Sequence, residues 1–139
     1  MRRFSLKTLL ISFSMVAISM ALYPTAKQIF TWRTGQKRLI EFSKTDYLKY
    51  GYEDVNAAAK PVFEQTIASL SQLGPFEKEK DKLAILEQCV LELNKIQNDD
   101  TIKNSIETVE REIYCDIVLR FGDFVGVDFQ QLLDKTRDF

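Results

Sequence analysis

Apolar residues recur at intervals of three and four along residues 60–125, the spacing that gathers side chains on one face of an α-helix. Three such stripes are present: Val62, Phe63, Ile67 and Leu70; Leu83, Leu86, Val90 and Leu93; and Ile106, Val109, Ile113, Ile117 and Phe121. Gly74-Pro75 separates the first two stripes and Phe121-Gly122 ends the third, as expected at helix ends. The pattern predicts three amphipathic helices, the first beginning near Pro61 because proline fits a first helical turn.

Turn and cap signals lie between and after these helices. Gln97–Asp100 is a polar turn, and Asn104 precedes Glu107 by three residues, the spacing of a capping box. A short last helix is expected from Asp128 to near Thr136. No stretch alternates apolar and polar residues as a half-buried strand does. The expected fold is therefore all-α: a small helical bundle with a central antiparallel helical hairpin, preceded by an N-terminal signal or anchor helix.

The amino terminus has the pattern of an export signal. A basic start, MRRFSLK, leads into an apolar run from Leu9 to Tyr23. At 1.5 Å per residue this run forms about 22 Å of helix, less than the roughly 30 Å of a hydrocarbon core. Extended to residues 4–23, with Lys7 snorkelling to the surface, the segment can just span it. Cleavage after Ala21, retention as an anchor, and burial as a core helix are the three alternatives.

A basic, amphipathic stretch follows the apolar run. Ile29, Phe30, Trp32 and Leu39 are its apolar contacts, and Gly35 is expected to interrupt the helix. The chain is thus expected to divide into a signal peptide or signal anchor (1–23), a basic amphipathic linker helix (24–54) and an acidic helical domain (55–139).

Charge differs sharply between the two parts of the chain. Residues 24–50 carry six basic residues against two acidic ones, a net charge of +4, whereas residues 51–139 carry ten against eighteen, a net charge of −8. An acidic domain argues against nucleic-acid binding, which needs Lys and Arg to displace counterions. A basic start normally stays in the cytoplasm, so the domain is expected outside it, in the periplasm or anchored in the inner membrane.

The composition excludes several kinds of chemistry. The chain of 139 residues has room for one domain and contains no His. Ser-His-Asp and Cys-His catalysis, His-ligated zinc and His-based pH switches are therefore ruled out. No glycine-rich phosphate loop is present. We expect no cofactor and no metal.

The chain contains two cysteines, Cys89 and Cys115. Each lies thirteen residues from position 102, within the predicted hairpin bend, so antiparallel helices would place both at the same height. Outside the reducing cytoplasm, such a pair favours a disulfide, provided that both residues face inward. Two buried free thiols are the alternative.

Carboxylates are the remaining candidates for catalysis. Glu107, Glu110, Glu112 and Asp116 are close in sequence, and the last two are spaced as i and i+4. Basic residues, among them Arg111, alternate with them, which is typical of a solvated or salt-bridged helix face. We therefore expect that the protein is not an enzyme.

The C-terminal part resembles a family of small helical bacterial proteins catalogued only as a domain of unknown function. The resemblance covers about residues 55–139. It is carried by SIETVERE (Ser105 to Glu112), Asp116, Phe121-Gly122, Leu132-Leu133 and TRDF (Thr136 to Phe139). It implies an α-helical fold and no established activity. The chain departs from that family over residues 1–50, because the family members lack a signal segment.

The expected function is that of a non-catalytic, exported or membrane-tethered interaction protein with a protein partner. Residues 4–23 would contact the membrane if they are not cleaved. A periplasmic immunity protein that neutralises a secreted toxin is the alternative, because acidic, exported helical proteins of this size are common in that class and acidic surfaces steer toward basic partners. Arg137 is expected to pair with Glu110 or Glu112. The candidate surface comprises Glu107, Glu110, Arg111, Glu112, Asp116, Arg137 and Asp138.

Overall fold

The structure is a computed structural model that describes the backbone of residues 6–139 and the side chains of residues 14–20 and 22–139. Within these residues the chain is all-helical, as predicted. Its helices are α1 (Leu6–Ser43), α2 (Glu53–Ser71), α3 (Glu79–Gln97), α4 (Thr108–Val125) and α5 (Gln130–Thr136).

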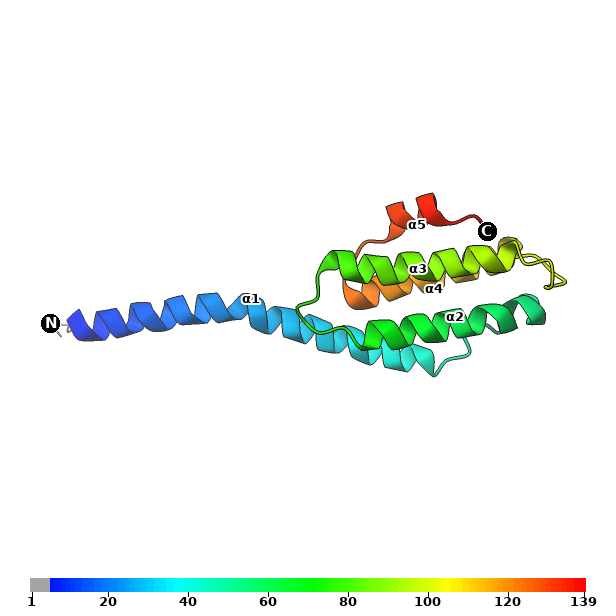
Figure 1. Ribbon diagram of the computed structural model, residues 1–139. Coiled ribbons are helices and arrows are strands. Elements are labelled where there is room, and N and C mark those ends of the chain that lie inside the picture. The colour runs from blue at the N-terminus through cyan, green and yellow to red at the C-terminus, as the bar shows by residue number, and fades with distance from the viewer. Residues whose placement is uncertain (1–5) are drawn as a thin grey trace.

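The helices form a bundle from which one end of α1 projects (Figure 1). The C-terminal part of α1 packs against α4 and α2, α2 packs against α3, and α3 packs against α4. Helix α5 lies against α3. The N-terminal part of α1 extends away from all of these elements (Figure 1). The described chain therefore consists of a bundle and a protruding helical rod.

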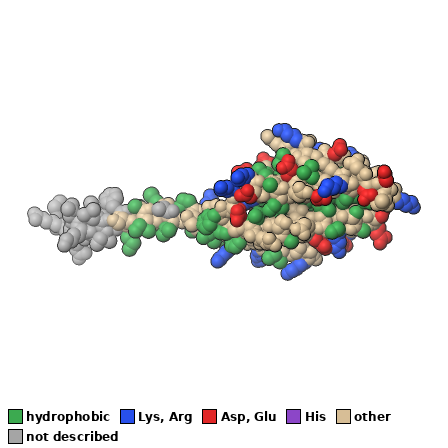
Figure 2. All heavy atoms as spheres, viewed as in Figure 1, with side chains coloured by type: hydrophobic (Ala, Val, Ile, Leu, Met, Phe, Trp, Pro, Cys, Tyr) green, Lys and Arg blue, Asp and Glu red, His purple; other side chains and the backbone are tan. Residues whose placement is uncertain are grey.

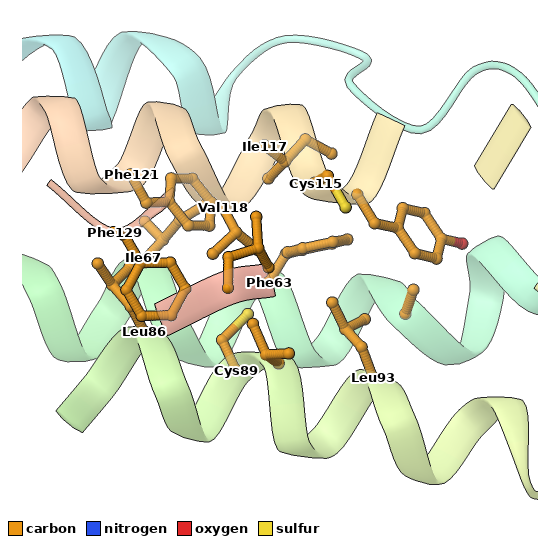
Figure 3. Packing of buried hydrophobic residues seen from close by; sticks show 14 of the residues in the cluster. Phe63, Ile67, Leu86, Cys89, Leu93, Cys115, Ile117, Val118, Phe121 and Phe129 are labelled. Carbon is orange, nitrogen blue, oxygen red and sulfur yellow. The ribbon is translucent and has the colours of Figure 1, made fainter. Parts of the chain in front are cut away.

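Aromatic rings fill the centre of the bundle. The ring of Phe63 on α2 lies 5.4 Å from that of Tyr114 and 6.2 Å from that of Phe121, both on α4. Phe42 on α1 contacts Phe121 edge-on at 5.5 Å. Edge-to-face packing at these separations is favourable for aromatic pairs. Leu86 and Leu93 (Figure 3), together with Val90, bring α3 into the same core. All of these core residues except Phe42 and Tyr114 belong to the stripes predicted from sequence.

One predicted stripe is wrong at one residue. Val109 was expected to face the core, but 54% of its surface is exposed. The neighbouring Glu110 is buried instead, with 2% exposed. Glu110 lies four residues after Ile106 and four before Tyr114, both buried. Glu110 therefore lies on the buried face of α4, at the spacing that the helical period requires.

Helix α2 begins earlier than predicted. It starts at Glu53 rather than near Pro61, which lies inside the helix. Glu53 and Asp54 occupy the first turn, where carboxylates interact favourably with the helix dipole. Pro61 therefore does not mark the start of α2, which lies two turns earlier in the chain.

The predicted break at Gly35 is also wrong. Helix α1 runs without interruption from the predicted signal segment through the predicted linker to Ser43. Gly35 is buried where α1 crosses α4, and a Cβ placed on it would collide with the carbonyl oxygen of Phe124. The glycine permits two backbones to approach closely.

The ends of α4 and α5 depart only partly from expectation. Asn104 does not cap α4 but donates its backbone N–H and its side-chain amide to the carboxylate of Asp54, at 3.0–3.2 Å. Helix α4 continues past Gly122 and ends at Val125, where Gly126, whose φ of 73° is left-handed, forms the C-cap. The last helix was expected from Asp128. It begins at Gln130, whose N–H donates to the Asp128 carboxylate at 3.1 Å, and it ends at Thr136 as predicted.

Candidate functional site

The structure does not bring the predicted acidic surface together. Glu107 precedes α4 and is exposed, as is Arg111. Asp138 lies on the C-terminal tail, where its backbone N–H donates to Asn94 Oδ1 at 2.8 Å. These residues line no common cavity.

Glu110 is buried and hydrogen-bonds the turn that precedes α2. Its Oε1 accepts the backbone N–H of Tyr52 at 2.6 Å, and its side chain packs against Gly51. Gly51 has a φ of 95°, a conformation that favours glycine. The carboxylate thereby connects the turn before α2 to the first turn of α4.

Glu112 and Asp116 face a different region. Both line an open hollow of about 600 Å³ between α4 and the segment joining α1 to α2, together with Tyr47 and Tyr50. Asp116 accepts a hydrogen bond from Arg120 Nε at 2.7 Å, with both side chains more than half exposed. Such exposed ion pairs contribute little to stability.

Arg137 does not pair with Glu110 or Glu112, contrary to the prediction. Its Nη1 donates to the sulfur of Cys115 at 3.3 Å, and its Nη2 lies 3.3 Å from Asp134 Oδ1. The tail is held instead by Asn94, which donates to the carbonyl of Thr136 at 2.8 Å.

The predicted disulfide is absent. Cys89 and Cys115 are both free and buried. They lie on facing helices but point to different neighbours. Cys89 hydrogen-bonds Thr66 on α2, whereas Cys115 accepts from Arg137. Figure 3 shows their sulfur atoms on either side of Phe63. Equal height on two facing helices is not sufficient for a disulfide, because the two cysteine side chains must also face each other.

Alkaline pH should destabilise the bundle. Burial raises the pKa of Cys89 to about 12, and burial together with the charge of Glu110 also raises the pKa of Tyr114. Both groups are neutral when protonated. The unfolded chain therefore releases these protons at lower pH than the folded chain does, and stability falls as pH rises.

For Cys89 the loss begins near pH 9 and continues to about pH 12, at about 1.4 kcal/mol per pH unit once the unfolded thiol is ionised. Urea unfolding at pH 8, 9, 10 and 11 measures it. In Cys89→Ser, which lacks the thiol, the slope between pH 9 and 10 should be smaller. Stability that stays constant up to pH 11 would contradict this prediction.

A hollow that the sequence pattern did not predict lies where the protruding part of α1 meets the bundle. This junction pocket has a volume of about 350 Å³, and its walls include Lys27, Trp32, Leu73, Pro75, Lys82 and Phe124. Trp32 Nε1 donates to the carbonyl of Leu73 at 2.8 Å, and Gln36 Nε2 donates to that of Leu70 at 3.0 Å. The i, i+4 spacing of Trp32 and Gln36 places both on one helical face. This spacing is the feature of the sequence from which a contact at this junction could have been predicted.

The rod itself has an unusual surface. We call residues 14–28 the stalk; all of its described side chains are exposed. Six large apolar side chains are 51–73% exposed: Met15, Val16, Ile18, Met20, Leu22 and Tyr23. Ile18 and Met20 point about 160° apart around the helix axis, so these residues do not form one narrow stripe. In Figure 2 apolar side chains lie along both the upper and the lower edge of the stalk, and charged ones are visible only near the bundle.

In the part of the chain that the structure describes, no three His, Cys, Asp or Glu residues are grouped so as to hold a metal ion. Among the described residues, no helix is both long enough and apolar enough to cross a membrane. The predicted anchor at residues 4–23 lies largely outside the described side chains, so anchoring stays a prediction.

No protein-family model, no curated protein and no solved structure matches the chain.

Proposed function

We propose that this protein is a non-catalytic, membrane-tethered interaction protein whose bundle lies outside the cytoplasm. The observation that carries the proposal is the exposure of large apolar side chains around the stalk. Transfer of one such side chain out of water is favourable by about 1.5–3 kcal/mol, so the six together favour burial by on the order of 10 kcal/mol. A lipid bilayer can accept apolar side chains from every side of a helix.

Residues at the bundle end of the stalk and just after it support the same placement. Tyr23 and Trp32 are the residue types that concentrate at membrane–water interfaces. The exposed Lys27 and Arg33 follow the apolar side chains, where anionic headgroups attract basic residues. In this arrangement the bundle, with the hairpin of α3 and α4 at its centre, is presented at the membrane surface.

A matched pair of substitutions tests the tether. In a bacterial host, Val16→Asp should move the full chain from the carbonate-resistant membrane fraction toward the soluble fraction. A charge in the middle of a membrane helix costs roughly 2.5–3.5 kcal/mol. Val109→Asp should leave the distribution unchanged, because Val109 is a bundle residue of similar exposure, 54% against 51%.

Two results would overturn the tether. One is a wild-type chain recovered in the soluble fraction as a monomer. The other is an equal response of the Val16 and Val109 variants. A soluble wild-type oligomer that dissociates in Val16→Asp would replace the membrane with a second copy of the chain as the partner of the stalk.

The alternative, a periplasmic immunity protein that neutralises a toxin, has one supporting feature. The hollow that contains Tyr47 and Tyr50 is lined by three acidic and two basic side chains, those of Asp46, Glu112, Asp116, Lys49 and Arg120. Tyrosines beside an excess of acidic groups suit a basic protein partner. Co-expression with a toxin encoded beside this gene tests it. Protection by the wild type and its loss in Tyr50→Ala would favour this function.

A further inference from the structure

We propose that the junction pocket binds the phosphate headgroup of an anionic phospholipid. This inference rests on the proposed tether. It adds a specific lipid contact at the point where the stalk enters the bundle.

The pocket combines apolar walls with positive charge. Trp32, Leu73 and Phe124 supply apolar surface, and Lys27 and Lys82 supply two ammonium groups. No Asp or Glu lines the pocket. This is unusual for a domain whose residues 51–139 carry a net charge of −8. A phosphate group beside a short apolar stretch matches this lining.

Lys82 and Trp32 are held in place before a ligand arrives. Lys82 Nζ donates one hydrogen bond to the carbonyl of Val125 at 2.9 Å, which leaves two N–H groups for a phosphate. The bonds from Trp32 and Gln36 connect α1 to the C-terminal end of α2. Binding to a preorganised site avoids the entropic cost of ordering these side chains.

The position of the pocket selects a lipid rather than a free phosphate. Its first lining residues are Pro24 and Lys27, immediately after Tyr23, the last of the six exposed apolar side chains of the stalk. With the stalk in a bilayer, the pocket lies at the level of the headgroups. Phe76, which is 58% exposed, follows Pro75 at the rim and can contact acyl chains.

One carboxylate near the rim opposes an anion. Glu77 Oε1 lies 3.9 Å from the position that a Cβ on Gly74 would occupy. It is therefore close to the pocket without lining it. Removing its charge should strengthen binding, the opposite of the effect of removing a lysine charge.

Trp32, the single tryptophan of the chain, reports on the pocket directly. The full chain in a non-ionic detergent is titrated with short-chain phosphatidylglycerol, and Trp32 emission is recorded. A saturable change is expected, with an apparent affinity at least tenfold weaker in Lys82→Gln and stronger in Glu77→Gln. Lys95→Gln, also on α3 but paired with Glu92, should match the wild type.

Four outcomes would overturn the proposal. They are no saturable response, an equal response to short-chain phosphatidylcholine, an equal response to inorganic phosphate, and unchanged affinity in Lys82→Gln with its helical content intact. Because this titration needs no bilayer, a failed lipid site and a failed tether are distinguishable: the carbonate experiment reports only the tether.

Discussion

Gly35→Val should lower the free energy of unfolding by about 3 kcal/mol or more, as overpacking between rigid backbones does. Gly35 lies where α1 crosses α4, and a Cβ there would overlap the carbonyl oxygen of Phe124 and lie 3.0 Å from its carbonyl carbon. Backbone atoms cannot rotate out of the way. The two helices must therefore separate, which removes Leu39 and Phe42 from the core.

Gly74→Ala is the matched control. Gly74 lies between α2 and α3, and a Cβ there would meet only the end of the Glu77 side chain, at 3.9 Å. Its stability should stay within about 0.5 kcal/mol of the wild type. Urea unfolding followed by circular dichroism measures both variants.

Trp32 emission reports on docking of α1 in the same samples. A red shift in Gly35→Val would show that Trp32 has lost its bond to Leu73. Equal stability of the Gly35 and Gly74 variants would mean that α1 does not require the close approach.

Gly35 also shows why helix boundaries were harder to predict than helix faces. The faces follow from local periodicity, which Phe63, Leu86 and Phe121 obey. A glycine within a helical pattern can mark a break or a close backbone approach. Only its contact with Phe124, far away in sequence, distinguishes the two.

The cysteines show a similar limit. Sequence spacing determines the height of each residue along a helical hairpin, but the rotation of each helix depends on what else it packs against. Cys89 faces Thr66 because α3 also packs against α2. Cys115 faces the C-terminal tail through Arg137. The spacing of the two cysteines carries no information on the contacts made by α2 or by the tail.

The candidate surface was chosen by charge, and charge does not determine which way a residue faces. Glu110 and Glu112 are two positions apart, about 160° around the helix by the shorter way. One is consequently buried and the other exposed. The junction pocket was not predicted because its walls come from α1, the α2–α3 connection, α3 and α4, which only the fold brings together.

Glu110→Ala should destabilise the bundle by about 2–3 kcal/mol, the cost of leaving a buried donor without its partner. The variant removes the acceptor for the Tyr52 N–H and empties the space beside Gly51. Glu110→Gln keeps an acceptor oxygen and should lose roughly half as much.

Glu112→Ala, an exposed position on the same helix, should change stability by less than about 0.5 kcal/mol. Urea unfolding of the three variants measures the effect, and equal losses for Glu110→Ala and Glu112→Ala would contradict it. Tyr114 donates to Asn56, which in turn bonds the carbonyls of Leu48 and Tyr50. Because this second connection from α4 to the same turn remains in Glu110→Ala, the bundle should lose stability while its helical content at 25 °C stays close to that of the wild type.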